Sequence, residues 1–153
     1  MENTELMELI TKSISYGTVS QGSQYLEVVV PTDKIHDAAG QLRNLKGHPF
    51  DYLINMTAAD FIEKFTLYYH MESTETHNLI VLKTDIFERE KPEVDTLSDF
   101  WITAEFLERE VFDLFGIRFK NHPDLRRLFL EDDYGYPLRK DFKDEVNIIE
   151  LPN

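Results

Sequence analysis

Residues 105–142 read EFLEREVFDLFGIRFKNHPDLRRLFLEDDYGYPLRKDF, and the organisation of the chain follows from this stretch. Apolar residues recur at the spacing of one face of an α-helix, beginning a few residues earlier, at Phe100, Ala104, Leu107, Val111 and Leu114. Gly116 comes next, and glycine adopts the left-handed conformation that ends many helices without a steric cost. The pattern therefore predicts an amphipathic helix that stops at Gly116.

Arg109 lies four residues after Glu105 and four residues before Asp113. Side chains four apart are neighbours on the surface of a helix, and opposite charges at that spacing attract one another. The spacing therefore allows Arg109 to pair with an acid on either side.

The stretch after Gly116 is rich in arginine and aromatic residues and poor in periodicity. Pro123, Gly135 and Pro137 interrupt any regular element there. Such a composition is more typical of an interface than of an interior, because arginines and aromatics dominate the contacts between proteins. The set comprises Arg118, His122, Arg126, Arg127 and Arg139 among Phe119, Phe129, Tyr134, Tyr136 and Phe142.

These residues resemble the signature of a known family, the C subunits of proton-pumping NADH:quinone oxidoreductase (respiratory complex I), also called the 30 kDa subunit family. The match covers about the last third of the chain in three blocks that occur in the expected order. Many relatives carry a proline where this chain has Lys143, and many are longer at one or both ends. The matching residues are Glu108, Arg109, Glu110, Asp113, Gly116 and Ile117, then His122 to Leu128, then Pro137 to Phe142.

The resemblance implies a non-catalytic scaffold in the peripheral arm of the complex, on the cytoplasmic side of the membrane. The scaffold would brace the D subunit, which helps to form the quinone cavity, and would touch the B subunit, which holds an iron–sulfur cluster. It would carry no cofactor itself, with NADH, FMN, iron–sulfur clusters and quinone on other subunits. The residues expected to bind partners are Glu108, Arg109, Glu110, Asp113, Gly116, His122, Pro123, Asp124, Arg126, Arg127, Pro137, Arg139, Lys140 and Asp141.

Composition sets independent bounds on the class of protein. With 153 residues the chain has the size of one domain and can sustain its own core. It has no cysteine, which excludes disulfides and cysteine-ligated iron–sulfur clusters. Its apolar runs fall far short of the ~20 residues that span a bilayer, and its first residues lack the pattern of a signal peptide.

The net charge of −13 is distributed unevenly along the chain. Residues 1–107 hold 8 basic and 18 acidic side chains, whereas residues 108–143 hold 8 of each. An acidic body repels nucleic acid and anionic lipid, so we expect direct binding to neither. Together with the short apolar runs, this predicts no direct membrane insertion.

The remaining sequence predicts an α+β fold of two layers, with two helices on a mainly antiparallel or mixed sheet of about five strands. We expect helices over residues 4–15 and from Ile35 to Leu45, the second capped by Thr32 or Asp33, and a turn between Gly17 and Gly22. Strands are expected around Leu26–Val30, over 52–58 and 65–72, and at Leu79–Lys83, which is apolar on both faces and therefore central. The predicted divisions are a body over 1–97, a signature helix over 98–116 and an extended tail over 117–153.

Two further readings of the charged residues remain open. Glu108, Asp113 and His122 are chemically competent as metal ligands or acid–base catalysts, which would suit a free-standing metal-dependent hydrolase. However, residues five apart on a helix differ by about 140° in direction, so structural roles are favoured for Glu108 and Asp113. Alternatively, the arginines could tie the tail to its own acidic body, wholly or in part.

The complex to which the chain would belong also has alternatives. Related subunits of membrane-bound hydrogenases and of other quinone- or ferredoxin-linked dehydrogenases share the signature. An independent module that binds an unrelated acidic protein through the arginine–aromatic tail is a third possibility. The irregular composition of the tail favours mobility when no partner is bound.

Overall fold

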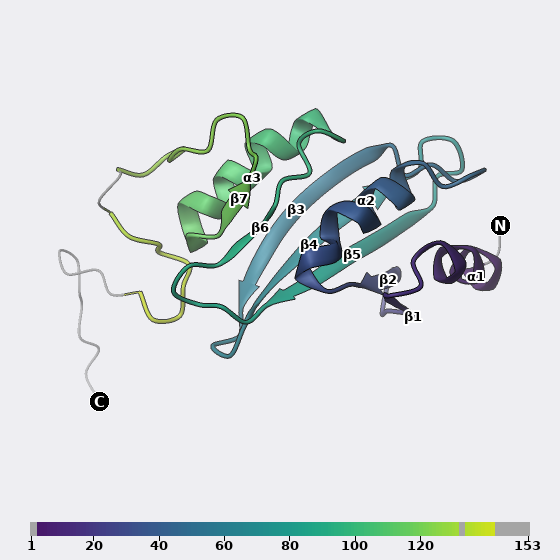
Figure 1. The fold of residues 1–153 in the computed structure, drawn as a ribbon, viewed down its shortest axis with the longest axis horizontal. Coiled ribbons are helices and arrows are strands. Elements are labelled where there is room, and N and C mark those ends of the chain that lie inside the picture. Colours follow the sequence, from purple (N-terminus) through teal and green to yellow (C-terminus); the bar gives the residue numbers. More distant parts are fainter. Residues whose placement is uncertain (1–2, 132–133, 143–153) are drawn as a thin grey trace.

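A mixed five-stranded sheet forms the centre of the molecule (Figure 1). The computed structural model describes residues 3–131 and 134–142. Strand order is β1-β2-β5-β4-β3, with β2 and β5 parallel and all other neighbours antiparallel. The strands are β1 Thr18–Gln21, β2 Leu26–Val29, β3 Tyr52–Asp60, β4 Phe65–Glu72 and β5 Leu79–Ile86. The predicted α+β class with a mixed sheet of about five strands is therefore confirmed.

Three α-helices and a second, two-stranded sheet complete the described part of the chain. The helices are α1 Asn3–Ser13, α2 Ile35–Arg43 and α3 Ile102–Phe115, with a 3-10 helix η1 over Thr32–Lys34 directly before α2. The small sheet pairs β6 Glu93–Asp95 with β7 Arg118–Lys120 in parallel. Among the described helices none combines the length and the apolarity needed to cross a bilayer.

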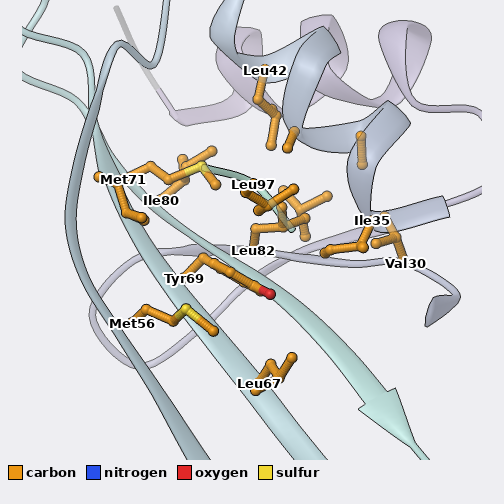
Figure 2. Close-up of a cluster of buried hydrophobic side chains, with 14 of the residues drawn as sticks. Val30, Ile35, Leu42, Met56, Leu67, Tyr69, Met71, Ile80, Leu82 and Leu97 are labelled. Carbon is orange, nitrogen blue, oxygen red and sulfur yellow. The ribbon is translucent and has the colours of Figure 1, made fainter. Parts of the chain in front are cut away.

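One face of the five-stranded sheet carries the core (Figure 2). Alternate residues of β4 point to this face, and they pair with buried residues of β5, such as Tyr69 with Leu82. Buried side chains of α1, α2 and α3 join the same cluster. β5 lies between β2 and β4 and buries Ile80, Val81 and Leu82 in succession, as predicted for a central strand.

A β-bulge corrects the prediction for β3. Simple alternation places Tyr52, Ile54 and Met56 on one face and Leu53 on the other. Instead, Leu53 pairs with Met71 and Asn55 with His70, so Ile54 is an extra residue without a partner. The bulge brings Leu53 and Met56 to the core together, while Tyr52 and Ile54 remain exposed.

Other local expectations were wrong for reasons of long-range bonding. The segment expected as a turn after Gly17 forms edge strand β1, because Thr18–Gln21 bonds to β2. Neither Thr32 nor Asp33 caps α2; the hydroxyl of Thr32 instead donates to the carbonyl of Asp85 at 2.6 Å. The charged segment 87–99, for which the sequence pattern predicts no regular element, contains a strand, β6, whose partner β7 is far away in the sequence.

The end of α3 agrees with the prediction, but its buried face is rotated. Gly116 has φ 77° in the left-handed region, and its N–H donates to the carbonyl of Phe112. A Cβ at this glycine would lie 2.6 Å from the ring of Tyr136, so the tail can pack here only because residue 116 has no side chain. The helix buries Ala104, Glu108, Val111, Phe112, Asp113 and Phe115, whereas Leu107 and Leu114 are only partly buried.

The bulge generates a prediction about stability. Leu53→Ala should cost roughly 2–5 kcal/mol in the free energy of unfolding, because it empties a site in the core. Ile54→Ala, the adjacent matched change, should cost within about 0.5 kcal/mol because its side chain faces solvent. Urea denaturation of both variants measures this, and losses of equal size would contradict the bulged register.

Candidate functional site

The candidate site is the place where the tail crosses the signature helix α3. The chain leaves β6, runs through α3 and returns as β7 beside β6. Backbone bonds close this loop, from Thr96 N–H to the carbonyl of Lys120 and from Arg118 N–H to that of Pro92. The tail therefore begins from a position fixed on the body, and its later residues meet buried carboxylates of α3 and β3.

Asp113 is the first of these carboxylates. Its side chain is fully buried and accepts a hydrogen bond from Arg127 Nε at 2.5 Å, and the side chain of Arg127 is only 7% exposed. The backbone N–H groups of Phe129 and Leu130 donate to the other carboxylate oxygen at 2.9 and 3.3 Å. Burial alone would raise the pKa of Asp113, but the hydrogen bonds from Arg127 and Phe129 outweigh it and hold the pKa below its ordinary value.

The guanidinium of Arg127 makes further contacts beyond Asp113. One of its terminal nitrogens donates to the carbonyls of Asp113 and Gly135 at 3.1 and 2.7 Å. The guanidinium lies 5.0 Å from the centre of the Tyr136 ring. This arginine therefore connects α3 to two separate parts of the tail.

Asp60, at the end of β3, is the second carboxylate and was missed by sequence reasoning. Arg89 binds it with two hydrogen bonds of 2.6 and 3.0 Å, and the N–H groups of Ile62 and Lys140 donate at 2.8 and 2.9 Å. The bonds from Arg89 lower the pKa of Asp60 well below its ordinary value. An aspartate between a strand and a turn was the available signal, but the distant donors are invisible locally.

Arg139 lies inward as well. Its Nε donates to the carbonyl of Phe115 at 2.5 Å, beside the left-handed Gly116. Its guanidinium is 5.1 Å from the ring centres of both Phe65 and Tyr136. Burial lowers the pKa of Arg139 from its ordinary value. The end of α3 is thus covered by the tail.

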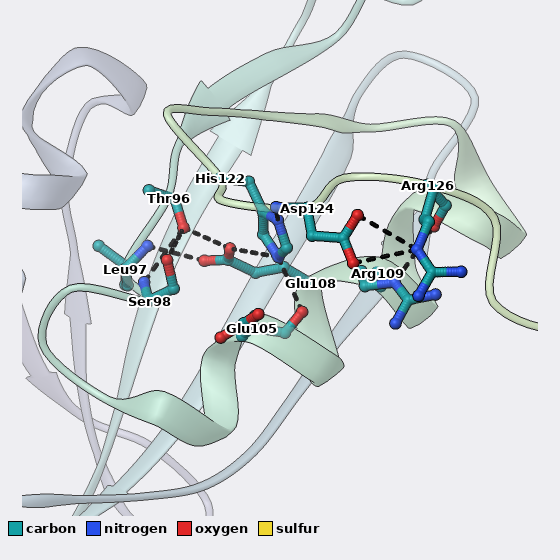
Figure 3. A network of polar contacts seen from close by, with 9 residues as sticks. All are labelled: Thr96, Leu97, Ser98, Glu105, Glu108, Arg109, His122, Asp124 and Arg126. Atoms are coloured by element: carbon teal, nitrogen blue, oxygen red, sulfur yellow. Dashed lines mark hydrogen bonds and ion pairs between the residues drawn. The ribbon is translucent and has the colours of Figure 1, made fainter.

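Glu108 and His122 form the third buried group (Figure 3). Glu108 is fully buried and accepts hydrogen bonds from the hydroxyl of Thr96 at 2.5 Å and from Leu97 N–H at 2.7 Å. Burial, the largest effect, raises the pKa of Glu108 to about 7, against the lowering influence of these two bonds. The negative charges of Asp99 and Glu105 raise it further.

The hydrogen bonds of His122 define its protonation state. Nδ1 is 3.0 Å from the N–H of Asp124 and must accept, whereas Nε2 is 2.8 Å from the carbonyl of Glu105 and must donate. This pattern needs a neutral imidazole. Nε2 also lies 3.8 Å from Glu108, but a neutral ring makes this a close approach rather than an ion pair. His122 therefore anchors the tail to α3 through its backbone carbonyl.

The other signature residues take varied positions. Arg109 uses neither of the pairings that the spacing allows, with Glu105 or with Asp113; it donates to the carbonyls of Arg126 and Arg127. Arg126 and Asp124 form an exposed ion pair. Glu110 and Pro137 are partly buried, Pro123, Lys140 and Asp141 are exposed, and Asp141 lies 3.8 Å from Arg89. Residues 143–153, the end of the predicted tail, lie outside the described residues.

The geometry divides the three residues of the metal hypothesis. Glu108 and His122 come together, but Asp113 is bound to Arg127 elsewhere on α3. Within residues 3–131 and 134–142, no group of three or more potential ligands could hold a metal ion. The alternative in which arginines tie the tail to its own body therefore holds for Arg127 and Arg139, which bond to Asp113 and to the carbonyl of Phe115.

Comparison with known proteins identifies the family to which this chain belongs. The family model of the respiratory-chain NADH dehydrogenase 30 kDa subunit matches residues 28–146. The chain belongs to this 30 kDa subunit family. The predicted resemblance is confirmed, and the match extends well beyond the last third of the chain.

Members of the 30 kDa subunit family occur alone and in longer chains. The C subunit of the NADH-quinone oxidoreductase of Moorella thermoacetica is 38% identical over 128 residues, which are 82% of this chain and 84% of that protein. The C/D subunit of the NADH-quinone oxidoreductase of Phocaeicola vulgatus is 45% identical over 128 residues, 82% of this chain but 24% of the relative. The chain thus spans about a quarter of the fused relatives.

A solved structure shares the fold of this family member. A chain from the membrane-bound sulfane sulfur reductase, an archaeal respiratory membrane complex, superimposes with a TM-score of 0.82 at 28% identity. The alignment covers 95% of this chain and 88% of that one. The relatives named here are thus subunits of NADH-quinone oxidoreductases, and the solved structure with this fold is a chain of a respiratory membrane complex.

The contrast between two adjacent arginines provides a test. Arg127→Ala should cost roughly 3–5 kcal/mol in the free energy of unfolding, because it leaves the buried charge of Asp113 without its partner. Arg126→Ala removes one half of an exposed pair and should cost at most about 1 kcal/mol. Equal losses for the two variants in urea denaturation would mean that Arg127 is not a buried anchor.

Proposed function

We propose that this chain is the scaffold C subunit in the peripheral arm of a proton-translocating NADH:quinone oxidoreductase. In this role it braces the D subunit, which helps to form the quinone site, touches the B subunit and carries no active site or cofactor itself. NADH, FMN, iron–sulfur clusters and quinone then lie on other subunits. The proposal places the chain on the cytoplasmic side of the membrane, as a peripheral part of a hetero-oligomer.

The observation that carries the proposal is the division of the tail into two sides. Arg127, Arg139 and His122 bond to the body, so they fix the path of the tail. Large apolar residues of the same segment face outward, with Phe129 70%, Leu138 51% and Tyr134 44% exposed. A segment that is bonded to the body and presents aromatic and apolar side chains beside exposed Arg126 and Lys140 suits contact with another protein.

The relatives supply the candidate partner. The name of the Phocaeicola relative, C/D, joins the C and D subunits within one polypeptide. Covalent fusion keeps two modules at high effective concentration, which favours a shared interface between them. We therefore assign the D subunit to the outward face of the tail. The partner-binding role of the signature residues is direct for Asp124, Arg126, Lys140 and Asp141, and indirect for those that hold the tail in place.

A second parent complex has one observation in its favour. The likeness to a chain of the sulfane sulfur reductase suits an equivalent role in a related membrane enzyme, including a hydrogenase or a ferredoxin-linked dehydrogenase. The two candidates differ in their neighbouring subunits rather than in the chemistry of this chain. Mass spectrometry of the proteins that co-purify with the tagged chain distinguishes them.

The experiment uses the tagged full chain in its native cells, with membranes solubilised in a mild detergent. The D and B subunits of an NADH:quinone oxidoreductase should co-purify with it. The double variant Phe129→Ser/Leu138→Ser should lose the D subunit while retaining wild-type stability, because both side chains face solvent in the free chain.

Tyr52→Ser is the matched control, since Tyr52 is 46% exposed but lies on β3 instead of the tail. It should retain the D subunit. Co-purification of sulfane sulfur reductase or hydrogenase subunits would identify a different parent complex. Co-purification of the D subunit with the double variant would show that the tail surface does not bind it. A purified chain that turns over substrate alone would contradict the scaffold role.

A further inference from the structure

A buried acid without a cationic partner stands apart from the other carboxylates. Asp60 and Asp113 each bind an arginine, whereas Glu108 has none among the described residues. Four other titratable groups face it. Glu105 lies on α3, and Asp99 lies in the loop before it. The tail contributes the neutral imidazole of His122, and β4 contributes the buried phenol of Tyr69.

A short chain of hydroxyl groups leads from this carboxyl to a pocket. Thr96 Oγ lies 2.5 Å from Glu108 Oε2 and 2.8 Å from Ser98 Oγ. Ser98 and Thr96 both line a pocket of about 460 Å³. The pocket is acidic, with Asp95 and Asp99 in its wall beside His36, Asn121 and Pro123.

We propose that Glu108 is a buried proton-binding site, loaded from this pocket through the hydroxyls of Ser98 and Thr96. The ligand is a single proton, delivered by water in the pocket. A hydronium ion in the pocket gives a proton to Ser98 Oγ and becomes water, the proton of Ser98 passes to Thr96 Oγ, and that of Thr96 passes to Glu108 Oε2. Each step makes one O–H bond and breaks one, so the net change is one proton gained by the carboxyl.

Both states of the site keep their hydrogen bonds. With Glu108 charged, Thr96 donates to it and accepts from the hydroxyl of Ser98. With Glu108 protonated, the carboxyl donates to Thr96, and Thr96 donates to Ser98. Because the direction of the chain reverses without moving heavy atoms, the proton can enter while the fold stays intact.

The electrostatic surroundings favour a proton at this position. Burial away from water is the main cause that brings the pKa of Glu108 to about 7, and the charges of Asp99 and Glu105 act in the same direction. The site therefore changes occupancy near neutral pH. No metal ion or cofactor is needed for this role.

The sign of the effect on stability follows from linkage. The pKa of Glu108 in the folded chain lies above its ordinary value of 4.5, so the folded state holds the proton over a range where the unfolded state has lost it. The contribution of this proton to stability is complete below about pH 4.5 and is lost as the pH rises through about 7. The unfolding equilibrium constant should rise by roughly 300-fold across this window from this group alone.

The direct test is a carboxyl-carbon NMR titration of the full chain labelled at glutamate. The Glu108→Gln variant lacks the Glu108 signal and so identifies it. Because glutamine mimics the protonated form, the free energy of unfolding of this variant should lose the pH dependence described above. The Glu108 signal should titrate with a midpoint near pH 7. A midpoint at the ordinary value of glutamate would overturn the proposal.

Two variants separate the path from the site. Ser98→Ala should leave the midpoint in place and slow proton exchange at Glu108, seen as a change in relaxation dispersion of its signal. Thr96→Val should raise the midpoint as well, because the charged form loses a hydrogen bond. Thr103→Val on α3, outside the path, is the control and should alter neither. Unchanged exchange in Ser98→Ala would overturn the hydroxyl path.

Discussion

The structure depends on the ion pair between Asp113 and Arg127. A carboxylate taken out of water is costly unless donors replace its hydration, and α3 alone cannot supply them. Arg127 and two backbone N–H groups of the tail fill that need. Asp60 repeats the arrangement near the last described residues of the tail, where it binds the N–H of Lys140 together with Arg89. The acids of the body therefore determine the path of a segment that has almost no regular secondary structure.

This constraint explains how an irregular tail can serve as a structural surface. Its inward groups are satisfied by the body, which leaves Phe129, Tyr134 and Leu138 outward at fixed positions. A preorganised surface loses less conformational entropy on binding than a mobile one. Membership of the 30 kDa subunit family gives this surface a context in a respiratory complex. Glu108, the one buried acid described without an arginine, adds a group whose charge depends on pH rather than on a partner.

Sequence reasoning predicted those features that depend on local pattern. Alternation predicted β4, apolar residues on both faces predicted the central position of β5, and the glycine after the apolar stripe predicted the end of α3. It failed where distant residues decide. The bulge at Ile54 is imposed by pairing with β4, and the donors to Asp60 come from residues 89 and 140. The sequence does not distinguish the two adjacent arginines. The side chain of Arg127 is nevertheless buried and that of Arg126 exposed, because only Arg127 reaches Asp113.

Amide hydrogen exchange on the isolated chain tests most directly whether the body itself holds the tail. The N–H groups of Phe129 and Lys140, which donate to Asp113 and Asp60, should exchange slowly in the absence of any partner. Their protection should fall in the Asp113→Asn and Asp60→Asn variants, each at its own site. Exchange at the rate of an unfolded chain in the wild type would contradict the account.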